Sequence, residues 1–258
     1  MDYQTITYAV NDNIAVLTMN RADVMNAMNA QMRAEILHAV KAAGNDARVL
    51  VITGNGRAFC AGQDLGDGAS AAKIDLERVL RDEYGPMIQA INDSPIPTIA
   101  AVNGAAAGAG ANLALACDVV IATESAVFLQ AFSRLGLIPD AGGTYSLPRL
   151  VGNARAMGTS LFAEPVDAKT AAEWGMIWEA IADDEFEAHW KKRAAKLANG
   201  PTVGYRYIKE ALKASPKNDL ETQLSLEAKL QGKCGSTRDF TEGVVAFLDK
   251  RKPEFEGR

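Results

Sequence analysis

The stretch TIAAVNGAAAGAGANLALACDVVIA, residues 98–122, contains the pattern that decides the fold. It opens with a short apolar run over 98–102, which is typical of a buried strand. Small residues then lead into a helix predicted from about Gly110 to Ala116, and an apolar run over 118–122 predicts another strand. A strand, a helix and a strand in this order indicate one β-α-β unit of an α/β core with right-handed crossovers.

The same alternation extends toward the N-terminus. Two strands are predicted first, joined by the turn Asn11-Asp12-Asn13, and helices and strands then alternate. Gly44 predicts the end of the first long helix, because glycine readily takes the left-handed conformation that follows helix ends. The predicted segments are strands over 3–10, 14–19 and 48–53 and helices over 30–43 and 74–91.

The C-terminal part has a different pattern. From Asp183 onward the apolar spacing predicts helices almost without interruption, over 184–198, 203–214, 220–230 and 237–250. Amphipathic helices without strands to cover must pack on each other, on the core or on a neighbouring subunit. We therefore place a boundary near residues 199–201, between a core over 1–198 and a helical region over 199–258 that we expect to support oligomerisation.

The composition argues against several classes of protein. Of 258 residues, 48% are hydrophobic and 23% are charged, and the net charge of −5 with scattered basic residues argues against a nucleic-acid or anionic-membrane surface. The most apolar region, 96–122, is interrupted by polar residues and glycines, so it predicts a buried core and no membrane span. The first ten residues lack the basic and apolar segments of a signal peptide.

The cysteines and histidines do not suggest metal or nucleophile chemistry. Cys60, Cys117 and Cys234 are far apart and form no C-x-x-C motif, which favours reduced thiols in a cytoplasmic protein. His38 and His189 both lie in predicted helices, outside any motif for zinc binding or for a Ser-His-Asp triad. We expect no metal site.

Two segments rich in glycine and alanine are candidates for binding a developing negative charge. They are FCAGQDL, residues 59–65, and NGAAAGAGAN, residues 103–112. Small side chains leave backbone N–H groups accessible, and the second segment leads into a helix N-terminus, where the helix dipole favours negative charge. Two such N–H groups pointing at one oxygen form an oxyanion hole. Tight packing between a helix and a strand is the alternative, and a dinucleotide site is disfavoured because Leu113 replaces the third glycine.

Asp140 is the candidate for a carboxylate that transfers protons. It stands in LGLIPDAGGT, residues 135–144, after a proline and before a predicted helix. One role for it is an N-cap that accepts N–H bonds at the helix start. The other is a catalytic base, whose basicity would be raised by apolar neighbours such as Phe132, Leu137 and Ile138.

In their order and spacing, these segments resemble the enoyl-CoA hydratase/isomerase (crotonase) superfamily over essentially the whole chain. The matching motifs are NAMN at 26–29, EWGM at 173–176, and the runs over 59–65, 99–118 and 136–144. The resemblance implies an α/β fold built as a crotonase-like spiral of β-β-α units, with C-terminal helices that assemble trimers or dimers of trimers. It also implies an acyl-CoA thioester substrate and no separate cofactor, since coenzyme A is part of the substrate.

The resemblance also assigns site residues. The backbone N–H groups of Gln63 and Ala109 would form the oxyanion hole. Arg21 would contact the adenine or the phosphates of coenzyme A, together with Phe247 and Lys250 of a neighbouring subunit, and the alternative for these three is an ordinary solvated or packing role. The adenine pocket would be lined by Ala61, Gln63, Asp64 and Leu65.

The sequence departs from the family pattern where hydratases carry two glutamates that handle water. Asn112 and Phe132 occupy the matching positions, and neither side chain can abstract a proton at neutral pH. Asp140 matches the aspartate of isomerases in the family, and the run FSRLGLIPD, 132–140, is most similar to ring-epoxide isomerases of bacterial phenylacetate degradation. An aryl-CoA dehalogenase shares the aspartate but is disfavoured, because its histidine has no counterpart here.

We therefore expect an isomerase that removes a proton from an acyl-CoA, forms an enolate and returns the proton to another carbon, as in the rearrangement of 1,2-epoxyphenylacetyl-CoA to the oxepin thioester. The alternatives are an aliphatic Δ3,Δ2-enoyl-CoA isomerase, a hydratase, and a non-catalytic acyl-CoA-binding protein. Asn112 and Phe132 are expected to contact the ligand, although a structural partner fits Asn112 equally well inside a helix. The segment 66–72 is expected to be either a pocket wall or a surface loop.

Overall fold

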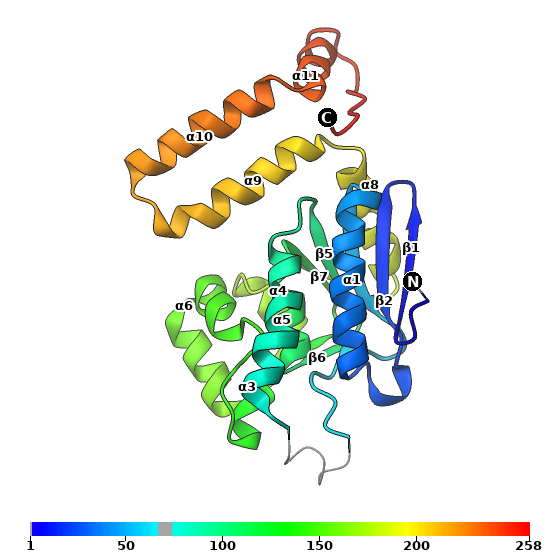
Figure 1. The fold of residues 1–258 in the computed structure, drawn as a ribbon, viewed down its shortest axis with the longest axis vertical. Coiled ribbons are helices and arrows are strands. Elements are labelled where there is room, and N and C mark those ends of the chain that lie inside the picture. The colour runs from blue at the N-terminus through cyan, green and yellow to red at the C-terminus, as the bar shows by residue number, and fades with distance from the viewer. Residues whose placement is uncertain (1, 67–73) are drawn as a thin grey trace.

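A six-stranded sheet lies at the centre of the structure, a computed structural model that describes residues 2–66 and 74–258 (Figure 1). The strand order is β1-β2-β3-β5-β7-β10, with β1 antiparallel to β2 and every later pair parallel. Parallel strands covered on both faces explain the continuous apolar runs predicted for the central strands. The strands are β1 (Ile6–Asn11), β2 (Ile14–Met19), β3 (Val49–Gly54), β5 (Thr98–Val102), β7 (Val119–Thr123) and β10 (Glu179–Ile181).

A second sheet contains four short strands in the order β4-β6-β8-β9. Its first three strands each follow a strand of the large sheet along the chain, so that β4 comes after β3, β6 after β5 and β8 after β7, and a helix follows each pair. The repeating β-β-α unit implied by the family resemblance is therefore confirmed. The short strands are β4 (Ala58–Cys60), β6 (Ala105–Ala107), β8 (Val127–Leu129) and β9 (Val166–Asp167).

Helices cover both faces of the large sheet. On one face α1 (Ala30–Asp46) and α4 (Gly85–Asn92) contribute to the main apolar core, and on the other α8 (Phe186–Ala198) packs Trp190 against the strands. The remaining helices are α3 (Leu76–Val79), α5 (Ala109–Leu115), α6 (Gly143–Phe162), α7 (Ala168–Glu173), α9 (Thr202–Ala214), α10 (Leu220–Gly235) and α11 (Arg238–Leu248). A π-helical turn η2 (Leu80–Tyr84) and the 3₁₀ turns η1 (Ala22–Val24), η3 (Ala131–Leu135) and η4 (Ser215–Lys217) complete the set.

Two helix predictions were wrong in detail. Gly44 does not end the first helix: it lies inside α1, and a Cβ atom at this position would be 3.0 Å from Cγ of Pro95. The glycine thus allows close packing and has no role as a cap. The helix predicted over 74–91 is also interrupted, because the five residues of η2 form a π-helical turn between α3 and α4.

The C-terminal helices leave the sheet after α8. Helix α9 lies across the top of the core, and Figure 1 shows α10 and α11 standing away from the sheet. Half-buried Lys209 joins α9 to the core through an ion pair of 2.6 Å between its Nζ and Oδ2 of Asp118. That the helical region supports oligomerisation stays a prediction.

Across 2–66 and 74–258, the helices lack the length and apolar character that a membrane crossing requires.

Candidate active site

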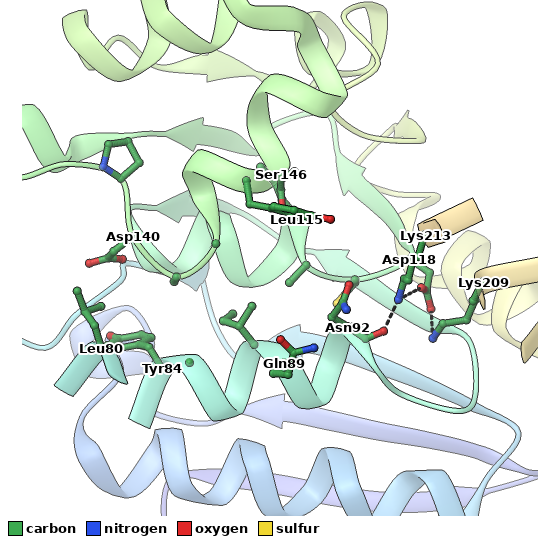
Figure 2. A pocket seen from close by; sticks show the side chains of 18 of the residues that line it. Leu80, Tyr84, Gln89, Asn92, Leu115, Asp118, Asp140, Ser146, Lys209 and Lys213 are labelled. Atoms are coloured by element: carbon green, nitrogen blue, oxygen red, sulfur yellow. Dashed lines mark hydrogen bonds and ion pairs between the residues drawn. The ribbon is translucent and has the colours of Figure 1, made fainter. Parts of the chain in front are cut away.

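Asp140 lies in the turn between η3 and α6, with its side chain facing a cavity of about 1080 Å³ (Figure 2). The N-cap position of α6 is occupied by Gly142, and no side chain caps this helix. The alternative role of Asp140 as an N-cap is therefore wrong. Its Oδ1 atom is buried, with no hydrogen-bond partner among the residues that the structure describes.

Burial raises the pKa of the Asp140 carboxyl from its ordinary 3.8 to about 6. Desolvation disfavours the charged form, so the carboxylate accepts a proton more readily than an exposed aspartate does. Leu137 and Ile138 line the same cavity, as expected, but they are 38% and 76% exposed. Leu80 and Tyr84, on the opposite wall, supply much of the apolar surface at this end (Figure 2).

The pH dependence of activity should report this pKa. A base is effective only as the carboxylate, so we expect kcat/KM to be constant above about pH 7 and to fall about tenfold per pH unit below the pKa of about 6. A pH profile of kcat/KM measures the inflection directly. An inflection at the ordinary value of 3.8 would contradict a desolvated base.

The pH dependence of stability should run opposite to that of activity: the free energy of unfolding should fall as pH rises. Because the carboxyl pKa is higher in the folded than in the unfolded state, the folded state is penalised as pH rises from 3.8 to about 6, and the penalty is constant above that range. Asp140→Asn removes the buried charge and should therefore raise the free energy of unfolding at pH 8 by about 1–2 kcal/mol, after allowance for solvent screening. Urea titrations at pH 4 and pH 8 test this, since the gain should vanish at pH 4.

The backbone of Asp140 is held by Asn112, which lies in α5 and is 1% exposed. Nδ2 of Asn112 donates to the carbonyl oxygen of Asp140 over 2.8 Å, and Oδ1 of Asn112 accepts from Nε2 of Gln130 over 2.8 Å. Gly143 allows this approach, because a Cβ atom there would be 2.3 Å from Nδ2 of Asn112. Of the two roles left open for Asn112, the structure shows the structural partner, and both polar atoms of its side chain are engaged.

Asn112→Asp should disturb the turn that carries Asp140. The substitution keeps the size of the side chain but places a carboxylate oxygen against the Asp140 carbonyl, where the amide donated a hydrogen bond. We expect a loss of about 2–3 kcal/mol in the free energy of unfolding and a fall of about tenfold in kcat. Chemical denaturation and steady-state kinetics measure the two effects. The same change at exposed Asn153 is the control and should be nearly neutral.

Two backbone N–H groups lie close to each other at the start of α5. Ala109 is the first residue of α5, and Gln63 follows Gly62, whose φ of 98° suits glycine. A Cβ atom on Gly62 would be 3.4 Å from the nitrogen of Ala109, so the two chain segments are in contact here. Neither N–H group has an acceptor within the described residues. The pair is thus available to bind an oxygen.

The side chain of Gln63 is fixed by a buried network. Its Oε1 accepts from Nη1 of Arg33 over 2.9 Å and from the hydroxyl of Tyr84 over 2.8 Å, and Arg33 is paired with Glu83. Burial raises the pKa of Tyr84 well above its ordinary value, so the hydroxyl remains a donor. Tyr84 also lines the cavity of Asp140, and α5 carries both Ala109 and Asn112. The amide pair and the carboxylate are therefore held by the same elements.

The expected coenzyme A contacts are only partly brought together within one chain. Nη1 of Arg21 forms an ion pair of 2.7 Å with Oδ2 of Asp64, which lowers the pKa of that carboxyl. Ala61 and the 42% exposed Leu65 flank this pair along the same segment. Phe247 is 83% exposed on α11, at the opposite end of the molecule from α3 (Figure 1). Lys250 follows α11, so both residues stay assigned to a neighbouring subunit as a prediction.

The remaining residues considered in the sequence do not join this site. Phe132 is buried beside Gly108, since a Cβ atom on that glycine would be 3.7 Å from the phenyl ring, but it does not line the cavity of Asp140. His38 is hydrogen-bonded to Tyr3, and His189 pairs with Glu179. No cluster suited to a metal ion occurs in the described part of the chain. Most of the predicted pocket wall over 66–72 lies outside the described residues.

Comparison with known proteins shows which family the chain belongs to. The family model described as enoyl-CoA hydratase/isomerase matches residues 9–258. The chain belongs to the enoyl-CoA hydratase/isomerase family. As a member of that family, it is an acyl-CoA hydratase or isomerase.

Two curated relatives in this family carry different activities in their names. A probable enoyl-CoA hydratase from Rhodobacter capsulatus is 58% identical over the full length of both chains. The 1,2-epoxyphenylacetyl-CoA isomerase of Escherichia coli is 44% identical over 96% of this chain and 97% of its own. The crystal structure of an enoyl-CoA hydratase from Bacillus anthracis superposes with a TM-score of 0.91, at 32% identity, covering 99% of this chain and 100% of the other.

Three residues of this enoyl-CoA hydratase/isomerase site were missed in the sequence. Tyr84 lies in the helix predicted over 74–91, where an aromatic residue at helical spacing with apolar neighbours does not indicate a site. Arg33 and Gln130 gave no signal, because a single polar residue in a helix or at a strand end usually faces solvent. Only the fold brings Arg33 to Gln63 and Gln130 to Asn112.

Proposed function

We propose that this protein is an acyl-CoA isomerase that acts through a thioester enolate, with Asp140 as its single base. One observation carries the proposal: a buried carboxylate without a hydrogen-bond partner among the described residues faces a cavity. Tyr84 and Asn112 connect this carboxylate to the segments that carry a pair of amides without an acceptor among those residues. Asp118, the second carboxylate in the described lining of the cavity, is committed to Lys209 and Thr98. Asp140 is therefore the one carboxylate of the described lining that is free to move a proton.

The reaction conserves atoms and electrons. Asp140 takes a proton from a carbon near the thioester carbonyl, and the electron pair of the C–H bond moves toward the carbonyl oxygen. The N–H groups of Gln63 and Ala109 bind this oxygen and stabilise its charge in the enolate. The protonated Asp140 then returns the proton to a different carbon, which shifts a double bond and regenerates the carboxylate. The chemistry consists of proton transfer, so it calls for no metal or redox cofactor besides the coenzyme A of the substrate.

For the acyl group we propose the ring of 1,2-epoxyphenylacetyl-CoA. The carbon–carbon bond shared by the epoxide and the six-membered ring would open, with its electron pair forming part of the new double bonds, to give the seven-membered oxepin. The proton transfer through Asp140 would then shift a double bond of the oxepin thioester. The 44% identity to an isomerase named for this substrate supports the choice. An aliphatic Δ3,Δ2-enoyl-CoA isomerase is the second candidate. The cavity volume of about 1080 Å³ favours it, because this space exceeds what one ring fills.

Hydration is less well supported, although the relative that is 58% identical is named a probable enoyl-CoA hydratase. Adding water by the two-glutamate route needs a second carboxylate, and Asn112 and Phe132 supply none. Incubation with crotonyl-CoA tests this directly, and accumulation of the 3-hydroxy product would favour the hydratase.

We also propose a homotrimer or a dimer of trimers as the working assembly. In that assembly Phe247 and Lys250 of a neighbouring subunit would join Arg21 and the segment from Ala61 to Leu65 around coenzyme A. The many exposed apolar side chains of α9, α10 and α11 support this, since such faces usually pack against another surface. Sedimentation equilibrium would determine the number of subunits.

Product analysis tests the function most broadly. The enzyme should be offered the epoxide thioester and a cis-3-enoyl-CoA side by side, with products identified by mass spectrometry and NMR. We expect products of unchanged mass from at least one of the two. Products heavier by one water would overturn the proposal in favour of hydration.

A further inference from the structure

The cavity beside Asp140 extends far beyond the space that an aromatic ring needs. Its volume is about 1080 Å³, whereas roughly 150 Å³ is enough to hold benzene. Figure 2 shows Leu80 near Asp140 at one end and Asn92 at the other. From Leu80 to Asn92 the helical chain advances roughly 18 Å at ~1.5 Å per residue. The cavity is therefore long as well as large.

The middle of this cavity is apolar. Side chains from η2, at the Asp140 end, and from α4, α5, α6 and α9 line it, and they suit a hydrocarbon chain. These side chains are Tyr84, Ile88, Leu115, Tyr145, Ile208 and Leu212. An acyl chain extending away from Asp140 would follow this lining toward α9.

The far end of the cavity is cationic. Lys209, Lys213 and Lys217 all line it, while Asp118 is the only carboxylate in the described lining at this end. Figure 2 shows Asp118 between Lys209 and Lys213, on the opposite side of the view from Asp140. Three positive charges against one negative charge leave an excess of two.

The three lysines differ in how far their ammonium groups are already engaged by other residues. Nζ of Lys209 is fully used, because it contacts Oδ2 of Asp118 at 2.6 Å and donates to the carbonyls of Ser94 and Ile96. Lys213 donates to the carbonyl of Asn92 and lies 3.4 Å from Asp118, so its ammonium group keeps a donor. Lys217 has no ion pair or hydrogen bond to the described residues. Lys213 and Lys217 therefore remain available to an anion.

We propose that this end of the cavity binds a carboxylate at the distal end of the acyl chain. The substrates would then be mono-CoA thioesters of long dicarboxylic acids. This inference rests on the second candidate of the proposed function, the aliphatic Δ3,Δ2-enoyl-CoA isomerase, because it specifies the substrate class of that candidate at the same site. A carboxylate replaces the water around the ammonium groups with charge-assisted hydrogen bonds, whereas a methyl end removes that water without compensation.

The length of the cavity determines which length of acyl chain can reach the lysines. An extended chain advances ~1.2 Å per bond, since a residue of three backbone bonds spans at most ~3.6 Å. A path of roughly 18 Å then corresponds to about fifteen bonds. Dicarboxylic acids of about fourteen carbons should fit, and those of about six carbons should be too short to reach the lysines.

Calorimetric titration of the whole enzyme with saturated thioesters tests this. The probes are three acyl-CoA compounds of about fourteen carbons, ending in methyl, hydroxyl or carboxylate. Saturated chains cannot isomerise, so binding is measured apart from turnover. We expect the carboxylate probe to bind about 10–100-fold more tightly than the methyl probe, with an advantage that falls as salt rises.

Variants show whether the lysines are responsible. The double substitution Lys213→Gln with Lys217→Gln should abolish the advantage of the carboxylate probe. The control, Lys192→Gln with Lys196→Gln on the exposed face of α8, makes the same change in charge and should preserve it. Equal binding of the three probes by the unmodified enzyme, or an advantage that survives in the first variant, would overturn the inference.

The test of the carboxylate subsite and the test of the isomerase can fail independently. A carboxylate preference without turnover of any 3-enoyl or epoxide thioester would support the subsite and reject the isomerase. Turnover of those thioesters without a carboxylate preference would reject the subsite and keep the isomerase.

Discussion

Replacing Asp140 with asparagine is expected to lower kcat for isomerisation by about 10²–10⁴-fold, the usual contribution of a positioned base. The side chain keeps its size but loses the ability to accept a proton at neutral pH. The cavity and the amide pair are unchanged, so the Kd for acyl-CoA should change by less than about threefold. Steady-state kinetics with a 3-enoyl-CoA and calorimetry with a saturated acyl-CoA measure the two quantities.

The control is Asp93→Asn, a carboxylate at the end of α4 that does not line the cavity. It should leave kcat unchanged. If Asp140→Asn retained full turnover, another group would have to move the proton. If neither form turned over any acyl-CoA and both bound it equally, the chain would be a non-catalytic acyl-CoA-binding protein.

Gly110→Ala is expected to lower kcat by about 10²–10³-fold, comparable to the loss of one oxyanion-hole donor. A Cβ atom at this position would lie 2.2 Å from the carbonyl oxygen of Cys60, and backbone cannot move aside as a side chain can. The start of α5 must therefore shift away from β4. That shift carries the N–H of Ala109 away from the N–H of Gln63, so that one oxygen no longer meets both.

The matched control is Gly232→Ala in α10, where a Cβ atom would meet nothing within 4 Å. Alanine favours the helix there, so stability should be unchanged or slightly higher. Rates should be expressed per folded molecule, with circular dichroism used to confirm the fold of both variants. A fully active, folded Gly110→Ala protein would show that the amide pair is not part of the reaction.

Much of the core could be predicted because its elements are long or strongly apolar. The strands over 14–19 and 98–102 have the predicted bounds, since turn residues and prolines delimit their apolar runs. The second sheet was missed because strands of two or three residues are too short to show a period. Gly44 was misread for a related reason: its contact is with Pro95, far along the chain, and no local pattern records it.

The candidate site was predictable only in part. Asp140 could be singled out by its Pro-Asp turn, but the choice between cap and base depended on burial, which a sequence does not contain. The lysines of α9 are spaced like an ordinary solvated helix face. Only the packing of α9 over the cavity turns Lys213 toward it. The sequence therefore does not predict which groups from distant segments come together at the site.

The most direct test of the enolate mechanism is deuterium uptake at the carbon next to the carbonyl of phenylacetyl-CoA. This thioester has an acidic C–H group but no double bond to shift, so exchange with D₂O reports proton removal alone. We predict that the enzyme catalyses exchange, followed by NMR, and that Asp140→Asn abolishes it while still binding the thioester. Exchange at the uncatalysed rate with the unmodified enzyme, or undiminished exchange in the variant, would contradict Asp140 as the base.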